Sequence, residues 1–210
     1  MVVEDDHVVV DSPHTAFRRQ VREQALELAA AQLAESRWDQ IRIGQIAHAV
    51  GVSRPTMYAE FGSKDGFGEA LVMFEVQRFL AGIGAALEAS SDTPIKAVER
   101  AVSYTITEGQ KSPVIRAILT SGVNGDPSGA DSLLPFVTTR SETLMATSNE
   151  ALRAWFSANA PGSSKRDIAD AVDTLIRVVI SHMLGADGKP RQTSAQAGRI
   201  AAKLLPELVR

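Results

Sequence analysis

The 210-residue chain contains no cysteine. This absence excludes disulfide bonds, thiolate metal sites and a cysteine nucleophile, and it suits a reducing cytoplasm, which is the location we expect. The chain also lacks an uninterrupted run of about 18 apolar residues, which a membrane-spanning helix requires. Its first ten residues carry acids where a signal peptide carries positive charge, so we expect neither membrane association nor export.

The chain also has no excess of basic over acidic residues, with 22 Lys and Arg against 25 Asp and Glu. The formal net charge is -3, which argues against a protein that coats nucleic acid without specificity. Residues 15–65 are more balanced, with seven Arg or Lys against six Asp or Glu. Any DNA binding must therefore depend on where individual charges lie.

Alternation of apolar and polar residues, the signature of β-strands, is absent over any useful length, and so is a repeat of solenoid period. Apolar residues recur instead at three- and four-residue steps, which indicates amphipathic helices. We predict an all-α fold of about nine helices, with its clearest loop at residues 121–131. The expected helices cover residues 15–36, 43–50, a segment after Ser53, 64–89, 94–109, 114–120, 132–157, a segment after Ser164, and 194–208.

Motifs of known catalytic centres are missing as well. The sequence has no nucleophile elbow, no glycine loop that could hold a phosphate, and no histidine and carboxylate spacing typical of a metal site. Its four histidines are scattered along the chain. We therefore expect no enzymatic activity, no cofactor and no metal.

Residues 41–67 have the spacing of a helix-turn-helix. Ile46 and Ala47 from a first short helix can face Met57 and Phe61 from a second. Between the two helices, Gly51 can adopt the positive φ that a sharp turn requires. A cap at Ser53, followed by a proline in the first turn, predicts the start of the second helix.

The second helix leaves polar side chains on its outer face. Hydroxyl groups can bind phosphate oxygens, an arginine can bind guanine with two hydrogen bonds, and the apolar parts of Thr and Pro can contact a thymine methyl group. This face therefore indicates DNA recognition. Its residues are Ser53, Arg54, Pro55, Thr56 and Tyr58.

This stretch resembles the DNA-binding head of the TetR family in the pattern I-A-x-x-x-G-V-S-x-x-x-x-Y-x-x-F-x-x-K. The matching residues are Ile46, Ala47, Gly51, Val52, Ser53, Tyr58, Phe61 and Lys64. Residues 1–13 mix acids with valines and end in Ser12-Pro13, which indicates a flexible tail. For the rest of the chain, the resemblance implies a helix-turn-helix domain at 14–63 and a ligand-binding and dimerisation domain at 64–210.

The resemblance also implies that the second helix enters the major groove, with Tyr58 and Lys64 on phosphates. The full predicted DNA-binding set is Arg42, Gln45, Ser53, Arg54, Pro55, Thr56, Tyr58 and Lys64. Arg42 departs from the Thr or Ser that often starts the first short helix in this family. Its phosphate contact would be ionic, and the helix cap would be lost or supplied by another residue.

For the body, the resemblance implies a homodimer through the last two helices, a palindromic double-stranded operator and a small effector. An apolar stripe from Ile168 to Met183, together with Leu204 and Leu208, fits either that dimer interface or the subunit's own core. An interaction module that binds proteins rather than DNA is the alternative reading.

Apolar residues dominate the candidates for a ligand pocket, which favours a small apolar effector. The predicted set is Phe74, Tyr104, Ile118, Phe136, Arg140, Leu144, Ile176 and His182. Each of the three polar members is, taken alone, more often structural. The stretches LLPFVTTRSETL and RVVISHML further resemble actinobacterial TetR-like regulators found beside alkane-oxidation genes. This resemblance implies a long acyl or alkyl ligand, such as a fatty acid.

Overall fold

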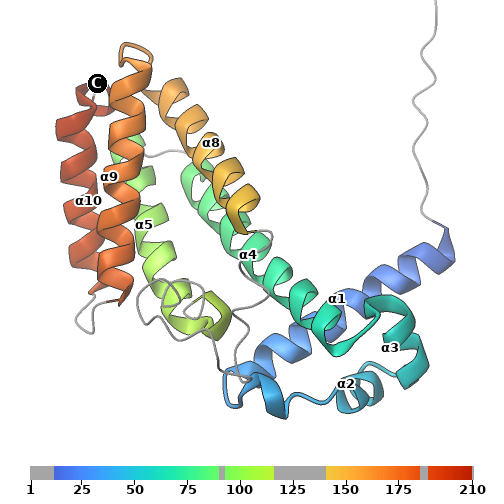
Figure 1. Ribbon diagram of the computed structural model, residues 1–210. Helices are drawn as coiled ribbons and strands as arrows, with labels where there is room; N and C mark the ends of the chain where they lie inside the picture. The colour runs from blue at the N-terminus through green and yellow to red at the C-terminus, as the bar shows by residue number, and fades with distance from the viewer. Residues whose placement is uncertain (1–11, 90–92, 116–140, 185–188, 210) are drawn as a thin grey trace, which may run out of the picture.

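A computed structural model describes residues 12–89, 93–115, 141–184 and 189–209 of the chain (Figure 1). Every secondary-structure element in these ranges is a helix, which confirms the predicted all-α class. At residues 141–148 and at 184 the description covers the helical backbone but not the side chains. The predicted loop at 121–131 lies outside the described residues, as do most of the helix expected at 114–120 and the first part of the one expected at 132–157.

The N-terminal elements form a small head. They are α1 (Pro13–Leu33), the short 3-10 helix η1 (Trp38–Gln40), α2 (Ile43–Ala49) and α3 (Arg54–Phe61). Helix α1 takes in Pro13, which we had assigned to the tail. It begins there because the Ser12 hydroxyl accepts a hydrogen bond from the Thr15 backbone N–H at 3.2 Å, and because proline suits a first helical turn.

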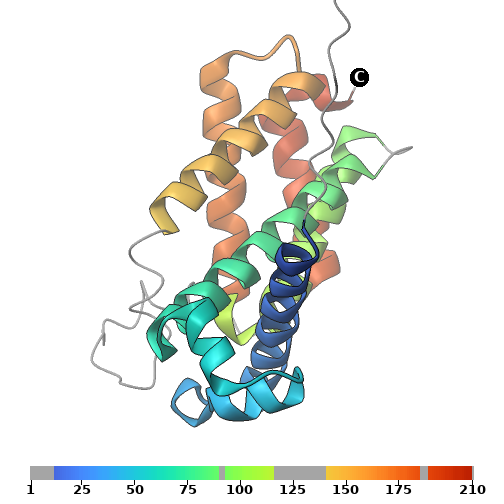
Figure 2. The same ribbon diagram turned by 90° about the vertical axis from the view of Figure 1, so that its right-hand side faces the viewer.

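Helix α4 (Lys64–Glu88) joins the head to the body, and Figures 1 and 2 show it running from one to the other. It begins where predicted, because the Ser63 hydroxyl accepts a hydrogen bond from the Gly66 backbone N–H at 3.0 Å. The mean hydropathy of α4 reaches 1.5, so the helix is long and apolar enough to cross a membrane. Core helices of soluble proteins meet the same test of length and composition. In this fold Phe67 and Leu71 are fully buried in the head core.

The body contains α5 (Pro94–Lys111), α8 (Ser141–Asn159), α9 (Lys165–Leu184), α10 (Pro190–Leu204) and the 3-10 helix η2 (Pro206–Val209). Ser164 caps α9 as predicted, because its hydroxyl accepts a hydrogen bond from the Asp167 backbone N–H at 3.1 Å. Helix α10 begins four residues before the expected start, with Pro190 in its first turn. It ends at Leu204, four residues before the expected end at Leu208, because Pro206 interrupts the α-helix and the chain continues as η2. It packs closely along α5, where small residues such as Ala197 and Ala201 are fully buried.

The apolar stripe of α9 belongs to the subunit's own core. Its members lie in one buried cluster with residues of α5, α8 and α10, and their exposed fractions are 7% or less. These buried residues are Ile168, Val172, Leu175, Val179 and, beyond the helix, Leu208. Of the apolar residues assigned to a subunit interface, Leu204 is exposed (40%). The buried members of this stripe therefore belong to the subunit's own core, because they already bury their surface within the monomer, whereas Leu204 stays available to a partner.

Candidate DNA-binding surface

The turn between α2 and α3 has the predicted geometry. Gly51 has φ +75°, a conformation that residues with a side chain rarely adopt. The two helices pack on each other through Ile46, Ala47 and Met57, each at most 1% exposed. Since one side of α3 is fixed in this way, its opposite side must face outward.

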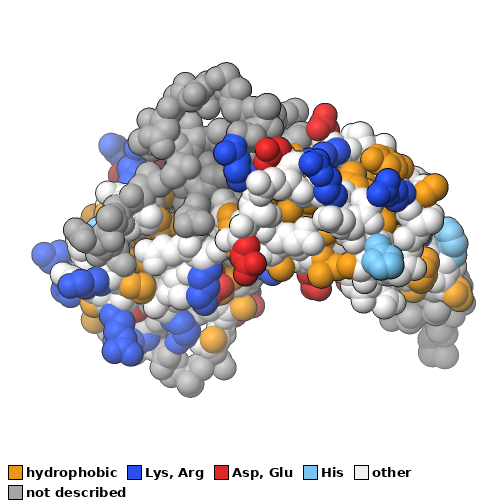
Figure 3. Space-filling model, turned by 90° about the horizontal axis from the view of Figure 1, so that it is seen from below, with side chains coloured by type: hydrophobic (Ala, Val, Ile, Leu, Met, Phe, Trp, Pro, Cys, Tyr) orange, Lys and Arg blue, Asp and Glu red, His pale blue; other side chains and the backbone are white. Residues whose placement is uncertain are grey.

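The outward side of α3 carries the predicted contact residues. Figure 3 views the molecule from the side of the head and shows Lys and Arg side chains among uncharged and apolar ones at the right. The Ser53 hydroxyl accepts from the Thr56 backbone N–H at 3.2 Å, so it caps the helix as expected. Tyr58 is 48% exposed, although aromatic side chains are usually buried. The exposed residues are Ser53, Arg54, Pro55, Thr56 and Tyr58.

Arg54 lies across the start of α2. A Cβ atom built on Gly44 would come within 2.2 Å of the Arg54 Nε atom, so the guanidinium occupies the space that glycine leaves open. This position places the cation at the junction of the two short helices. Because the side chain is exposed and flexible, it can turn from Gly44 toward a base edge.

Arg42 and Gln45 are both exposed at the start of α2. Arg42 occupies the cap position but makes no capping hydrogen bond with its side chain, as its departure from the family pattern led us to expect. Its Nη1 atom instead donates to the backbone carbonyl of Asp39 at 3.1 Å. The guanidinium is thereby held beside the segment that precedes α2, with further N–H groups for a phosphate.

Lys64 is positioned by a residue that the sequence analysis missed. The Trp38 ring is buried, packs against Phe67 with 6.1 Å between ring centroids, and has the Lys64 ammonium 5.3 Å from its own centroid. The same ammonium donates to the Asp39 carbonyl at 3.2 Å. An ammonium has three N–H donors, so this bond leaves two for a phosphate oxygen. A tryptophan just before the first short helix was the available signal.

Glu60 fixes the orientation of α3, and it too was missed. Its Oε2 atom accepts from Arg18 Nε at 2.9 Å and Nη2 at 2.7 Å, while its Oε1 atom accepts from Arg22 Nη1 at 3.2 Å. Both arginines lie on α1, and the Glu60 side chain is only 12% exposed. A two-point contact of this kind holds α3 against α1 at a defined angle.

An apolar cavity of about 190 Å³ lies in the body. Its described lining comes from α4, α5, α8 and α9 together with Ile115, and only Thr105 and Asn149 among these residues carry polar side chains. Phe79 and Ile83 of α4 form part of its wall. The cavity is therefore suited to an apolar group.

Of the predicted pocket residues, Ile176 lines this cavity. Tyr104 lines a neighbouring polar pocket instead, and Phe74 packs against the head core beside an outer groove. His182 hydrogen-bonds the Val178 carbonyl at 2.8 Å and lines neither cavity. The remaining members were Leu144, whose side chain is not described, and Ile118, Phe136 and Arg140, which lie outside the described residues.

Comparison with known proteins places these features in a family. Residues 25–71 match the model described as bacterial regulatory proteins of the tetR family. Residues 94–203 match the C-terminal domain of bacterial tetracycline repressors. The chain belongs to the TetR family. TetR-family proteins are DNA-binding regulators rather than enzymes, so transcription regulation through a helix-turn-helix is the function of this chain, and the reading as a protein-interaction module is not supported.

Individual relatives agree with this assignment. The chain is 23% identical over 168 residues to the HTH-type transcriptional regulator AlkX of Mycobacterium tuberculosis, a match that covers 80% of this chain and 77% of the relative. The crystal structure of the TetR family repressor AlkX from Dietzia sp., implicated in biodegradation of n-alkanes, superposes with a TM-score of 0.61 at 20% identity, covering 90% of this chain and 97% of that one. A tetR-family regulator from Streptomyces coelicolor gives 0.63 at 15% identity, with coverage of 91% and 82%. The expected similarity to alkane-associated regulators is thus confirmed.

Proposed function

We propose that the chain is a cytoplasmic repressor that binds a palindromic operator as a homodimer and is released by an apolar ligand with an acyl or alkyl chain. A long-chain fatty acid or acyl derivative is the ligand class that we favour. The observation that carries this proposal is that one continuous helix, α4, belongs to the head core at one end and to the wall of the apolar cavity at the other.

Helix α4 provides a physical route between the two sites. Its 25 residues span about 37 Å. Phe67 and Leu71 are fixed in the head core, while Phe79, Ile83 and Leu87 face the cavity further along the same helix. A ligand that displaces the second half of α4 must therefore also tilt or shift the head, because a helix transmits such a movement along its length.

The size of the cavity supports a ligand-dependent change. Ligand sites usually measure about 300–1,000 Å³, whereas an engineered cavity of about 150 Å³ holds benzene. The 190 Å³ found here accommodates a short alkyl segment. We infer that a long chain moves the surrounding helices apart, so that it binds an expanded conformation better than this one and shifts the population toward it.

A dimer would read two half-sites in successive major grooves. The half-site centres should then lie roughly 34 Å apart, one turn of the duplex, or a multiple of that distance. Two copies related by a two-fold axis require an operator that is approximately palindromic. The exposed side of α3 supplies the contacts for each half-site.

The outer faces of α9 and α10 are left for the proposed dimer contact, and apart from Leu204 their exposed side chains are mostly polar or charged. Asp170, Asp173 and Arg177 are exposed on α9, and Arg199 and Lys203 are exposed on α10. A hydrogen bond from Arg177 at 2.7 Å lowers the pKa of the Asp173 carboxyl, so that group is ionised at neutral pH. An interface of this composition should weaken with salt.

Sedimentation of the full-length protein at low and high ionic strength tests this dimer. We expect a dimer whose dissociation constant rises as salt is added, and we expect Arg199→Glu to weaken it further. A dimer that is insensitive to both changes would place the contact on another surface.

Operator release tests the ligand. We expect dodecanoate or palmitate to dissociate the protein from its operator in a gel-shift assay. Ile176→Phe should abolish this response, because a larger side chain fills the cavity, while operator binding without ligand is retained. Ile95→Phe is the matched control, since Ile95 is half-buried in the same body but does not line the cavity. Release that is equal in wild type and Ile176→Phe, or absent for all acyl and alkyl probes, contradicts the proposed ligand site.

A further inference from the structure

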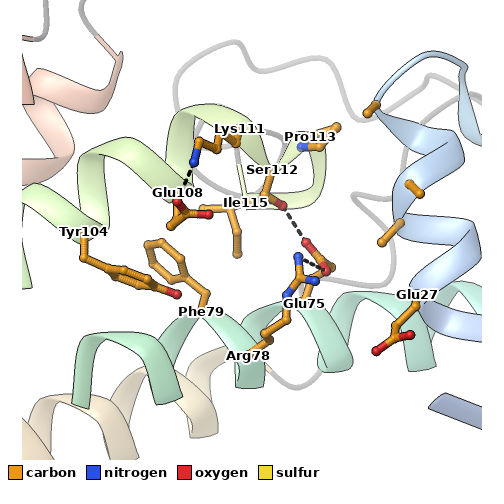
Figure 4. A pocket seen from close by; sticks show the side chains of 13 residues that line it. Glu27, Glu75, Arg78, Phe79, Tyr104, Glu108, Lys111, Ser112, Pro113 and Ile115 are labelled. Atoms are coloured by element: carbon orange, nitrogen blue, oxygen red, sulfur yellow. Dashed lines mark hydrogen bonds and ion pairs between the residues drawn. The ribbon is translucent and has the colours of Figure 1, made fainter. Parts of the chain in front are cut away.

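A second pocket, of about 460 Å³, lies where the head meets the body (Figure 4). Its volume falls within the range of small-molecule sites. Helix α1 contributes one wall with Glu27 and two alanines, and Ala34 just after the helix extends it. Helices α4 and α5, with three residues that follow α5, contribute the others. An occupant of this pocket would touch both parts of the molecule at once.

A buried carboxylate faces this pocket with one of its oxygens incompletely satisfied. The Glu75 side chain is only 3% exposed. Its Oε2 atom accepts a hydrogen bond from the Ser112 hydroxyl at 2.8 Å. Its Oε1 atom is buried and accepts no hydrogen bond from any described residue. A carboxylate oxygen in such a place costs free energy until a donor reaches it.

The Arg78 guanidinium is the cation paired with this oxygen, and a cationic ligand could take its place there. Its Nη2 atom lies 2.8 Å from Glu75 Oε1, but the pair lacks the alignment of a hydrogen bond. The Arg78 side chain is 60% exposed and also lies 5.9 Å from the Phe74 ring, toward the outer groove. Because the guanidinium is mostly in solvent, it can move away from Glu75 when another cation takes its place, whereas the buried carboxylate requires that some cation or donor remain beside it.

The rest of the pocket wall also favours a cation. Glu27, Glu75 and Glu108 face two basic side chains, Arg78 and Lys111, so the formal charge of the wall is -1. Lys111 is already paired with Glu108 at 2.8 Å. Glu27 is exposed on α1. The acidic groups therefore exceed the basic groups that could neutralise them.

Two aromatic rings complete the wall. Phe79 of α4 and Tyr104 of α5 lie with their ring centroids 6.1 Å apart. Burial raises the pKa of the Tyr104 phenol, and the nearby Glu108 raises it further, so the group is neutral at physiological pH. The face of a neutral aromatic ring attracts ammonium groups within about 6 Å.

We propose that this pocket is a binding site for an organic cation, an aromatic or alkyl ammonium that hydrogen-bonds Glu75 and packs against Phe79 and Tyr104. The site is distinct from the apolar cavity, although Phe79 and Ile115 border both. An anionic ligand such as a fatty acid carboxylate is disfavoured here by the acidic wall. Because α1 and α4 both line the pocket, its occupant can also bias the position of the head.

Direct binding to the full-length protein tests this site without DNA. The probes are 2-phenylethylammonium, the neutral 2-phenylethanol and the anionic 3-phenylpropanoate, measured by calorimetry and thermal shift at neutral pH. We expect the ammonium to bind with a Kd of about 1 mM or lower, and the other two to bind at least about tenfold more weakly. Equal binding of the three probes, or no binding of the ammonium, would overturn the proposal.

Substitutions locate the binding. Glu75→Gln keeps the size of the side chain and its bond to Ser112, and it should weaken ammonium binding by about tenfold to a hundredfold. It should leave the binding of dodecanoate unchanged, which separates this site from the apolar cavity. A Glu75→Gln protein that folds and binds the ammonium as wild type does contradicts the assignment.

Two substitutions at exposed positions of α1 test the same site if Glu75→Gln does not fold. Glu27→Gln, on the α1 wall, should weaken ammonium binding severalfold. Glu23→Gln is its matched control, because Glu23 is exposed one turn earlier on the same helix and does not line this pocket. If Glu27→Gln and Glu23→Gln bind the ammonium alike, the pocket is not the site.

Discussion

The head and the body differ in how completely their side chains fill the interior. Around α3, the side chains of Ile46, Met57 and Phe67 are fully buried. The Phe61 and Phe67 rings meet edge to face with centroids 4.8 Å apart. The body core instead borders the 190 Å³ cavity. The difference is consistent with our proposal that the head holds DNA-contacting side chains in place, whereas the body keeps space for a ligand.

The largest effect on stability should follow from truncating a buried side chain in the head core. Phe67→Ala should reduce the free energy of unfolding by about 3–5 kcal/mol, because it removes a fully buried ring and leaves a cavity. Ile176→Ala should cost no more than about 2 kcal/mol, since that side chain is half-buried beside space that already exists. Equilibrium denaturation in urea measures both. Equal losses would remove the contrast between the two cores.

A smaller effect is expected at the surface that the head core supports. Arg54→Ala should lower operator affinity by about 1–3 kcal/mol and relax the base preference at one position of each half-site, because we propose that the guanidinium contacts a base edge. Unfolding free energy should stay near that of wild type, since the side chain is exposed. Competition binding with operator variants and random DNA measures the change. Equal losses on specific and random DNA would show that Arg54 contacts only phosphate.

The smallest effect is expected at Lys64. Lys64→Ala should weaken binding to all sequences alike and reduce the salt slope of log K by about one, because the variant would lose the single phosphate contact that we propose for Lys64. The measurement is a titration of affinity against salt concentration. Lys64→Arg keeps the charge and serves as the control. A slope that does not change would mean that Lys64 only bridges Trp38 and Asp39 within the protein.

The sequence predicted the head much better than the body. Gly51, the Ser53 cap and the exposed side of α3 follow from local rules, because turns, caps and helical periodicity depend on neighbouring residues. The role of Glu60 depends on Arg18 and Arg22, which are about forty residues away in the chain, so no local pattern could reveal it.

Periodicity could not assign the body in the same way. The α9 stripe is apolar at helical spacing, and that pattern is the same for a core as for a subunit interface. Tyr104 and Ile176 were grouped as pocket residues because both lie among apolar neighbours. The packing of α4 and α5 separates them into a polar pocket and an apolar cavity. Such a division depends on how helices pack, which spacing along one helix does not contain.

Selection of binding sites from random double-stranded DNA by the full-length protein tests the proposed recognition surface most directly. We predict that wild type enriches an approximate palindrome with half-site centres roughly 34 Å apart, or a multiple of that spacing. The Arg54→Ala variant should enrich the same palindrome with one position of each half-site relaxed. Enrichment of no motif by wild type, or an identical motif for both proteins, would contradict DNA reading by the exposed side of α3.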